Sequence, residues 1–95
     1  METLSEIPMD PDKVKKEDVD REILRVGIIA ELDAVNLYEQ MAASTENEEI
    51  KRVLLNIARE EKTHVGEFQT LLLKLDGEQK KELEEGRKEV EEMQG

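Results

Sequence analysis

Two residues that could bind a metal ion lie in the middle of an apolar helical pattern. Glu61 and His64 are three positions apart, so their side chains point the same way on a helix. His64 is the chain's only histidine. A buried carboxylate is costly unless a cation pairs with it, and a metal ion would account for both residues. Two alternatives stay open. Glu61 could pair with an arginine of a neighbouring helix, and His64 could be a hydrogen-bonded core residue.

The pattern around this pair predicts one long helix over residues 50–75. Positions three or four residues apart form a single stripe, and all but two of them are apolar. The stripe consists of Ile50, Leu54, Ile57, Glu61, His64, Phe68, Leu71 and Leu75. Glu60 is a second candidate ligand, four residues before His64. The pattern favours Glu61, because it follows Ile57 by four residues, and we expect Glu60 to make a surface pair.

An earlier segment, expected to be helical from Glu17 or Asp18 to about Ser44, carries a similar carboxylate. Acidic residues in its first turns favour a helix start, because the helix dipole attracts negative charge there. One of its stripes contains a single carboxylate among mostly apolar residues. That stripe consists of Leu24, Ile28, Glu31, Val35, Tyr38 and Ala42. Gly27 lies beside it, and either permits close helix approach or is a tolerated flaw.

A short polar segment, residues 44–49, separates the two predicted helices. Thr45 or Asn47 could cap the second helix, and so short a connection predicts an antiparallel hairpin. Glu31 and Glu61 each lie fifteen residues from Glu46, or about 22 Å at the rise of an α-helix. The two carboxylates are therefore expected at one level, with His64 one turn away. This arrangement favours a metal site over a structural polar cluster.

Composition indicates a small protein that needs a partner to bury its apolar surface. The chain has 95 residues, of which 41% are charged, and no cysteine. A chain of this size buries little core, and oligomerisation is the usual remedy without disulfides. The net charge of −11 argues against nucleic acid as a partner. No apolar run approaches the roughly 20 residues of a membrane span, and no signal peptide is evident. We therefore expect a soluble, cytoplasmic protein.

The expected organisation has three parts: a flexible arm over residues 1–16, a helical hairpin over 17–76 and a helix or tail over 77–95. Gly77 is expected to end the second helix. A third, mostly solvated helix is expected from Glu78, broken or weakened at Gly86. Its thin apolar line predicts that it packs on a neighbouring subunit or frays.

The donor set gives half of a known kind of metal site. Two carboxylates and one imidazole suit iron, manganese or zinc better than calcium. Four-helix ferritin-like sites use a Glu from each of two helices and a Glu-x-x-His from each of the other two. One chain supplies Glu31 and the Glu61/His64 pair. We therefore predict an all-α fold: an antiparallel two-helix hairpin with a short C-terminal helix, dimerising into a ferritin-like four-helix bundle.

Two segments resemble the encapsulated ferritins, the ferritin-like cargo of encapsulin nanocompartments. They are AELDAVNLYEQ over residues 30–40 and REEKTHVGEF over 59–68, within a match that covers about 22–75. The resemblance implies that Glu31, Glu61 and His64 bind a di-iron centre that bridges two chains, with Tyr38 positioning a ligand. It also implies ring-like decamers of dimers, Fe(II) oxidation to Fe(III), and transfer of the product to the encapsulin shell for storage.

The chain departs from this family in two places. Asp33 matches an acidic position that leads iron toward the site, but Ala30 and Leu37 do not match the acid and aromatic found nearby in other members. No shell-docking signal follows Met93, so we expect either a truncated chain or a domain continuous with its shell protein.

Other interpretations also fit parts of the sequence. One is a rubrerythrin-like peroxide reductase, although half the usual length and the lack of cysteine count against it. The other is a non-catalytic helical scaffold whose Glu/His cluster is structural or holds zinc. Tyr38 could equally be an interface aromatic with its hydroxyl at the edge. Met41 and Met93 are interpreted as packing residues.

Overall fold

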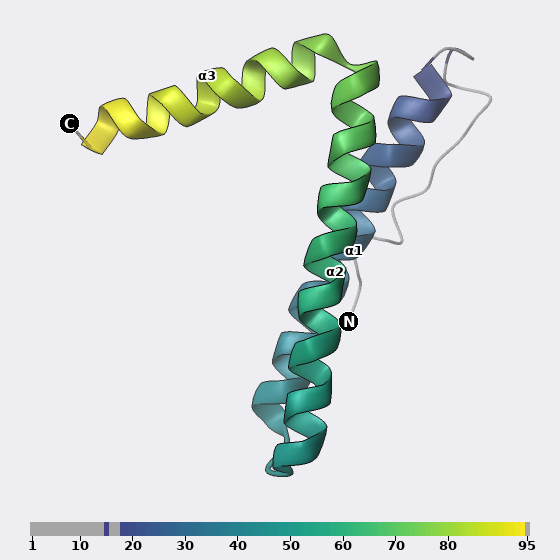
Figure 1. Cartoon of the computed structure of the whole chain (residues 1–95), viewed down its shortest axis with the longest axis vertical. Helices are drawn as coiled ribbons and strands as arrows, with labels where there is room; N and C mark the ends of the chain where they lie inside the picture. The colour runs from purple at the N-terminus through teal and green to yellow at the C-terminus, as the bar shows by residue number, and fades with distance from the viewer. Residues whose placement is uncertain (1–14, 16–17, 95) are drawn as a thin grey trace.

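The protein is a helical hairpin with a third helix that turns away from it (Figure 1). The computed structural model describes residue 15 and residues 18–94, so the expected N-terminal arm lies outside the described residues except for Lys15. The helices are α1 (Val19–Ser44), α2 (Glu48–Leu75) and α3 (Gly77–Gln94). This confirms the all-α prediction. None of the three helices has an apolar stretch long enough to cross a lipid bilayer.

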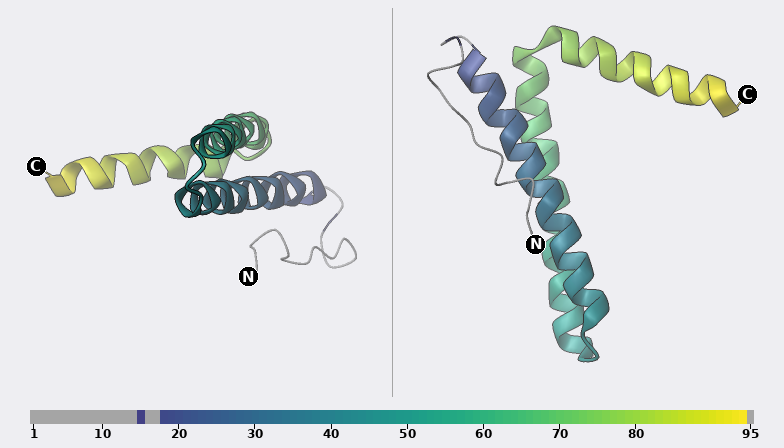
Figure 2. Two further views of the ribbon diagram at one scale, coloured as in Figure 1. Left: turned by 90° about the horizontal axis from the view of Figure 1, so that it is seen from below. Right: turned by 180° about the vertical axis from the view of Figure 1, so that it is seen from behind.

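α1 and α2 pack against each other, as the two views of Figure 2 taken together show. The turn between them is fixed by side-chain caps. Asn47 Oδ1 accepts hydrogen bonds from the backbone N–H groups of Glu49 and Ile50, each 3.0 Å long. Thr45 Oγ1 accepts one from the N–H of Asn47 at 3.1 Å. These bonds satisfy donors that the first turn of α2 would otherwise leave unpaired. Of the two expected caps, Asn47 is therefore the one that caps α2.

The corner between α2 and α3 differs from the sequence-based expectation. The second helix ends at Leu75, as expected, but the predicted glycine stop was wrong, because Gly77 is the first residue of α3 and no described glycine has a positive φ. Asp76 makes the interruption instead. Its Oδ1 accepts the backbone N–H of Gln79 at 3.0 Å, and its carbonyl accepts the N–H of Lys80 at 3.1 Å. The corner is thus an N-cap for α3 rather than a glycine stop for α2.

Of the two alternatives at Gly86, the break was wrong, since α3 runs through the glycine without interruption, whereas a weakened helix there stays a prediction. Ion pairs flank the glycine on the helix surface. Arg87 contacts Glu84 three residues earlier and Glu91 four residues later, and Lys88 contacts Glu85. Such pairs at helical spacing stabilise a helix slightly and so act against the weakening that a glycine causes.

The hairpin buries little apolar surface within one chain. Among the described residues, the buried hydrophobics are Leu24, Val35, Ala42, Ala58 and Leu72. Eleven large hydrophobic side chains of the same part of the chain remain exposed, among them Met41, Ile50 and Leu71. Exposed apolar area on this scale marks surfaces that bind other proteins. Dimerisation into a four-helix bundle stays a prediction.

Candidate metal centre

The structure brings Glu31, Glu61 and His64 together at mid-height of the hairpin. His64 Nδ1 lies 3.4 Å from Glu31 Oε2 and 3.4 Å from Glu61 Oε2. One donor atom from each residue lies within 4.8 Å of the other two. We refer to these three residues as the Glu/His cluster. In the part of the chain that the structure describes, no other group of three or more His, Asp and Glu side chains is placed to share an ion.

The helices explain why these three side chains meet. Glu61 and His64 project together because they are three residues apart on α2. Glu31 comes from α1. The short turn over residues 45–47 brings α2 back alongside α1, so that Glu31 faces the pair on α2. Beside the cluster, Lys62 Nζ lies 3.3 Å from Glu39 Oε2 and links the two helices again on their exposed side. The predicted register of the hairpin therefore produces the cluster without any special backbone geometry.

The cluster contains a buried acceptor without a donor. Oε2 of Glu31 is buried and has no hydrogen-bond partner. His64 Nδ1 lies 3.4 Å from that oxygen, which is longer than a usual hydrogen bond, and so does not satisfy it. A buried acceptor left unpaired costs about 1–3 kcal/mol, and more if it is charged. This is the observation expected where a cation belongs.

The donor set fits a divalent transition metal. Two carboxylates and a neutral imidazole suit iron, manganese or zinc, whereas calcium prefers oxygen ligands alone. Donors that share one ion at bonds of about 2.1 Å are at most about 4.2 Å apart. The cluster's atoms need only small side-chain rotations to reach that span. The three residues do not fill a coordination shell, so a complete site needs ligands from elsewhere.

Exposure differs across the cluster and shows where further ligands could come from. The side chains of Glu31 and Glu61 are each 19% exposed, whereas that of His64 is 45% exposed. The imidazole therefore lies at the open edge of the hairpin. A second hairpin against this edge could supply the missing ligands.

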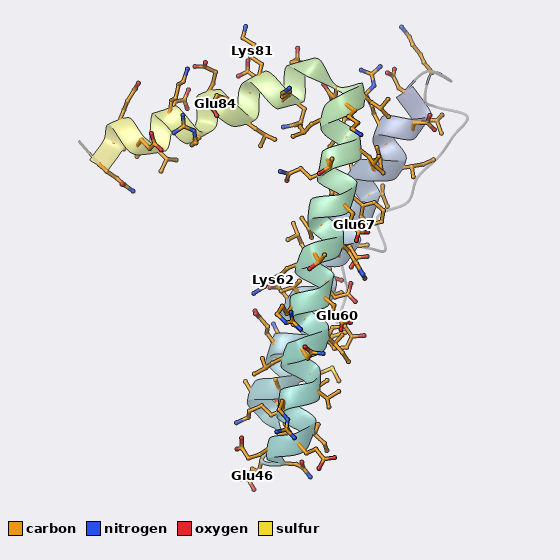
Figure 3. All side chains as sticks on the ribbon, in the orientation of Figure 1. Glu46, Glu60, Lys62, Glu67, Lys81 and Glu84 are labelled. Atoms are coloured by element: carbon orange, nitrogen blue, oxygen red, sulfur yellow. The ribbon has the colours of Figure 1, made fainter. Side chains whose placement is uncertain are left out.

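The other candidate residues lie outside the cluster. Glu60 is exposed, as predicted (Figure 3). Its carboxylate accepts a hydrogen bond of 3.4 Å from the side-chain amide of Asn56 and is not paired with a cationic residue among those described. Tyr38 is half-buried on α1, seven residues after Glu31, and Asp33 is also half-buried. The alternative of Glu61 paired with an arginine is not observed, since Glu61 contacts His64.

Sequence reasoning missed a different polar contact. Arg25 Nη2 donates a hydrogen bond to Asp76 Oδ2 at 2.8 Å, across 51 residues of chain. The sequence offered one signal, an acidic residue directly before the start of α3, where caps occur.

Comparison with known proteins places the chain in a family. A family model described as rubrerythrin matches residues 22–94. The ferritin-like–encapsulin shell fusion protein of Pyrococcus furiosus is 62% identical over 74 residues, which are 78% of this chain and 21% of that protein. The encapsulin nanocompartment cargo protein EncC of Myxococcus xanthus is 41% identical over 69 residues, or 73% of this chain and 52% of that protein.

A solved structure agrees with these matches. The crystal structure of the encapsulated ferritin domain from Pyrococcus furiosus superposes with a TM-score of 0.81 at 50% identity, covering 90% of this chain and 93% of that one. The chain belongs to the rubrerythrin family of ferritin-like proteins. The predicted resemblance to the encapsulated ferritins is confirmed, since the relatives carry that description or are named as encapsulin fusion and cargo proteins.

Proposed function

We propose that two copies of the chain pair through the open edges of their hairpins and oxidise Fe(II) to Fe(III) at the site they share. The observation that carries this proposal is the buried, unpartnered Oε2 of Glu31 beside Glu61 and His64. A cation would neutralise the buried carboxylates and satisfy that oxygen at once.

Pairing supplies what one chain lacks. Two Glu/His clusters related by a two-fold axis would give four carboxylates and two imidazoles, the full set of a ferritin-like di-iron site. Pairing would also cover exposed apolar residues near the turn, where Leu37, Met41, Ile50 and Leu54 line a surface hollow. Higher assembly into a ring, such as a decamer of paired chains, extends the same proposal.

Each residue of the cluster has a separate task in binding the Fe(II) substrate. The carboxylates of Glu31 and Glu61 offset the positive charge of the ions and become the stronger ligands as that charge rises. His64 adds a nitrogen donor at the open edge of the hairpin. In the reaction, each Fe(II) gives one electron to dioxygen and becomes Fe(III). Tyr38, on the same helix as Glu31, is proposed to position a ligand once two chains have paired.

The relatives suggest where the reaction takes place. One is described as a fusion with an encapsulin shell and another as an encapsulin nanocompartment cargo protein. We propose that this chain likewise works inside an encapsulin compartment, which would receive the Fe(III) for storage. This chain spans 21% and 52% of those two proteins, so the activity of the whole relatives comes to it only as a proposal.

Oxygen uptake after anaerobic loading with Fe(II) tests the activity. Removing residues that merely orient a ligand costs 10- to 100-fold in metal affinity or activity, so losing a ligand should cost at least about tenfold. We expect Glu31→Gln and His64→Ala to lose that much, and the exposed control Glu60→Gln to keep the wild-type rate. Wild-type rates in both cluster variants would refute the proposal, because the oxidation would then not depend on the cluster. No oxygen uptake above background by wild type would leave a non-catalytic scaffold.

Peroxide reduction is the second candidate, because the matching family model is described as rubrerythrin. The two activities differ in the oxidant that is consumed. Reduced, iron-loaded protein mixed separately with dioxygen and with hydrogen peroxide should react faster with dioxygen if it is a ferroxidase. Rapid consumption of peroxide, with slow oxygen uptake, would favour the reductase.

A further inference from the structure

Gly27 of α1 lies directly against the ring of Phe68 on α2. A Cβ atom on Gly27 would be 3.2 Å from both Cδ2 and Cε2 of that ring, and 3.4 Å from Cζ. Carbon atoms in favourable contact are about 3.5–4.0 Å apart, so a methyl group there would overlap the ring. The aromatic ring therefore packs on the bare backbone of α1. This contact decides between the two sequence-based interpretations of Gly27, since the glycine does permit a close approach.

The contact is one helical turn away from the Glu/His cluster. Gly27 precedes Glu31 by four residues on α1, and Phe68 follows His64 by four residues on α2. Residues four apart on a helix lie on the same face, about 6 Å apart along the axis. The Gly27–Phe68 contact and the Glu31–His64 contact are thus successive levels of one interface between the same two helices.

No other described glycine has this property. A Cβ on Gly66, Gly77 or Gly86 would meet nothing within 4 Å. Gly66 is a useful comparison, because it lies on α2 only two residues from His64. Replacing either glycine by alanine raises helix propensity by a similar amount. Only the replacement at Gly27 would also place a Cβ atom against a side chain of the facing helix.

We infer that Gly27 and Phe68 are a positioning pair that sets the spacing of α1 and α2 at the metal-binding level. The inference rests on the proposed metal site. A methyl group on Gly27 would force the ring or the helix away by a few tenths of an ångström. Metal-ligand distances are held to about 0.2 Å, so a displacement of that size, one turn away, is enough to weaken binding. Neither residue is itself a ligand.

Titration of the 95-residue chain with Co(II), followed by visible absorption, tests the pair without relying on turnover. Gly27→Ala should weaken Co(II) binding by about tenfold and change the absorption band of the bound ion. Gly66→Ala should bind as wild type. In the double variant Gly27→Ala/Phe68→Leu the smaller side chain makes room for the methyl group and should restore both affinity and spectrum. All variants are compared at a concentration where they sediment alike.

Two results would overturn the inference. One is wild-type Co(II) binding by Gly27→Ala, which would mean that the half-buried ring moves aside without consequence. The other is a double variant that binds no better than Gly27→Ala, which would mean that the ring is not the cause. If Gly27→Ala does not fold, the double variant is compared with wild type instead. Wild-type Co(II) affinity of the double variant then supports the pair, and a loss of about tenfold overturns it.

Failure of the proposed metal site gives a different result. In that case wild-type protein would bind Co(II) no better than Glu31→Gln. If wild type binds and Glu31→Gln does not, but Gly27→Ala is normal, only the positioning pair is wrong.

Discussion

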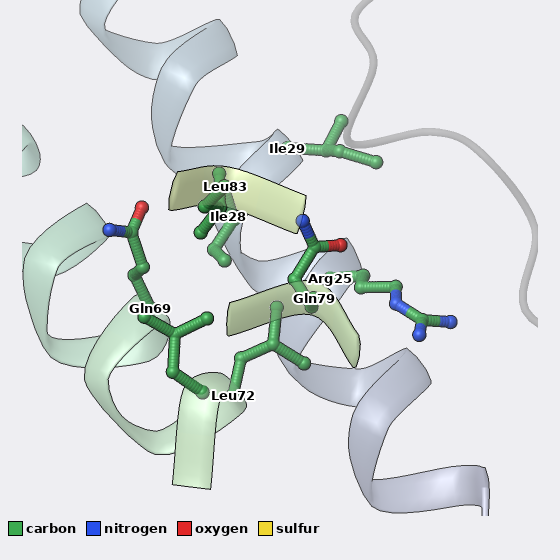
Figure 4. Close-up of a pocket in the computed structure, with 8 residues that line it drawn as sticks. Arg25, Ile28, Ile29, Gln69, Leu72, Gln79 and Leu83 are labelled. Atoms are coloured by element: carbon green, nitrogen blue, oxygen red, sulfur yellow. The ribbon is translucent and has the colours of Figure 1, made fainter. Parts of the chain in front are cut away.

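Arg25, in the first part of α1, is hydrogen-bonded to Asp76, the residue between α2 and α3. Arg25 Nη2, on α1, donates a hydrogen bond of 2.8 Å to Asp76 Oδ2, between α2 and α3. Asp76 is only 7% exposed, and its other oxygen caps α3 through the N–H of Gln79. An apolar hollow beside this contact is lined from all three helices, including Ile28, Leu72 and Leu83 (Figure 4). One carboxylate thus holds three helices in a fixed relation.

Substitution of Asp76 should release α3 from its orientation. Asn can still cap α3 but loses the ionic bond to Arg25, whereas Ala loses both interactions. The chain has no cysteine, so spin labels can be placed on Glu46→Cys and Lys88→Cys alone. The distance distribution between them should be narrow in wild type and broad in Asp76→Asn. In Asp76→Ala it should be broader still, with reduced helical circular dichroism.

The matched control for this experiment is Glu84→Gln. It breaks an ion pair with Arg87 that lies wholly on the exposed surface of α3. We expect the spin-label distances of this variant to equal those of wild type. Narrow, unshifted distances in both Asp76 variants would show that apolar packing alone fixes the corner.

Acidification should weaken the same corner. The hydrogen bond from the backbone N–H of Gln79, and next the one from Arg25, hold the pKa of Asp76 below its usual value of 3.8. A lowered folded-state pKa means that the stabilisation is complete above about pH 4, and is lost as pH falls through the folded value. The difference in melting temperature between wild type and Asp76→Asn should therefore shrink below about pH 4. A constant difference down to pH 2 would contradict this assignment.

Loss of the α2 cap should destabilise the hairpin. Asn47→Ala removes the acceptor for two backbone N–H groups, and such caps contribute about 1 kcal/mol. Urea unfolding should show that loss with an unchanged m-value. Asn56→Ala is the control, because Asn56 contacts only side chains on the surface of α2. Equal stabilities for the two variants would mean that water replaces the Asn47 cap without cost.

Glu31→Gln should separate metal binding from metal-free stability. The substitution removes a charge from a mostly buried position, so metal-free Glu31→Gln should melt at least as high as metal-free wild type. Metal at a hundred times its Kd stabilises a protein by about 2.7 kcal/mol. Differential scanning calorimetry with Mn(II) should show that gain in wild type only. A similar gain in the variant would place the ion elsewhere.

Ile50→Lys should weaken pairing of the chains. Ile50 is 50% exposed in one chain, and covering the remaining area would contribute about 1 kcal/mol per copy, or more than tenfold in association for two. Lys makes the net charge of −11 less negative, so charge alone would favour association. Sedimentation equilibrium should nevertheless show weaker association. Glu49→Lys, at the neighbouring exposed position, should not weaken it; a similar loss there would contradict an apolar interface at Ile50.

Helical periodicity and one short turn were enough to predict the hairpin and the meeting of Glu31 with Glu61 and His64. Both depend only on spacing along the chain and on the fixed rise of an α-helix. Burial and exposure around the cluster were harder to foresee. The half-exposed His64 shows that the stripe on α2 is not covered by α1 alone.

The corner was predicted poorly for a physical reason. Asp76 and Gly77 form a common helix-ending pair, and local chemistry does not say which of the two makes the stop. The role of Asp76 depends on Arg25, a residue far away in sequence whose approach requires the finished hairpin. Gly86 misled for a related reason. Glycine weakens a helix by an average amount, and the surrounding Arg87 and Lys88 ion pairs act against it here.

The 18 residues of α3 project from the hairpin with no buried side chain, so a change of angle at Asp76 would move the whole helix. At 1.5 Å per residue α3 is about 26 Å long, and a tilt of about 10° would displace its C-terminal end by roughly 4–5 Å. That displacement is close to the spacing of neighbouring side chains on a helix. A small change in the angle that Asp76 sets for α3 would therefore decide whether the C-terminal end of α3 contacts a neighbouring molecule.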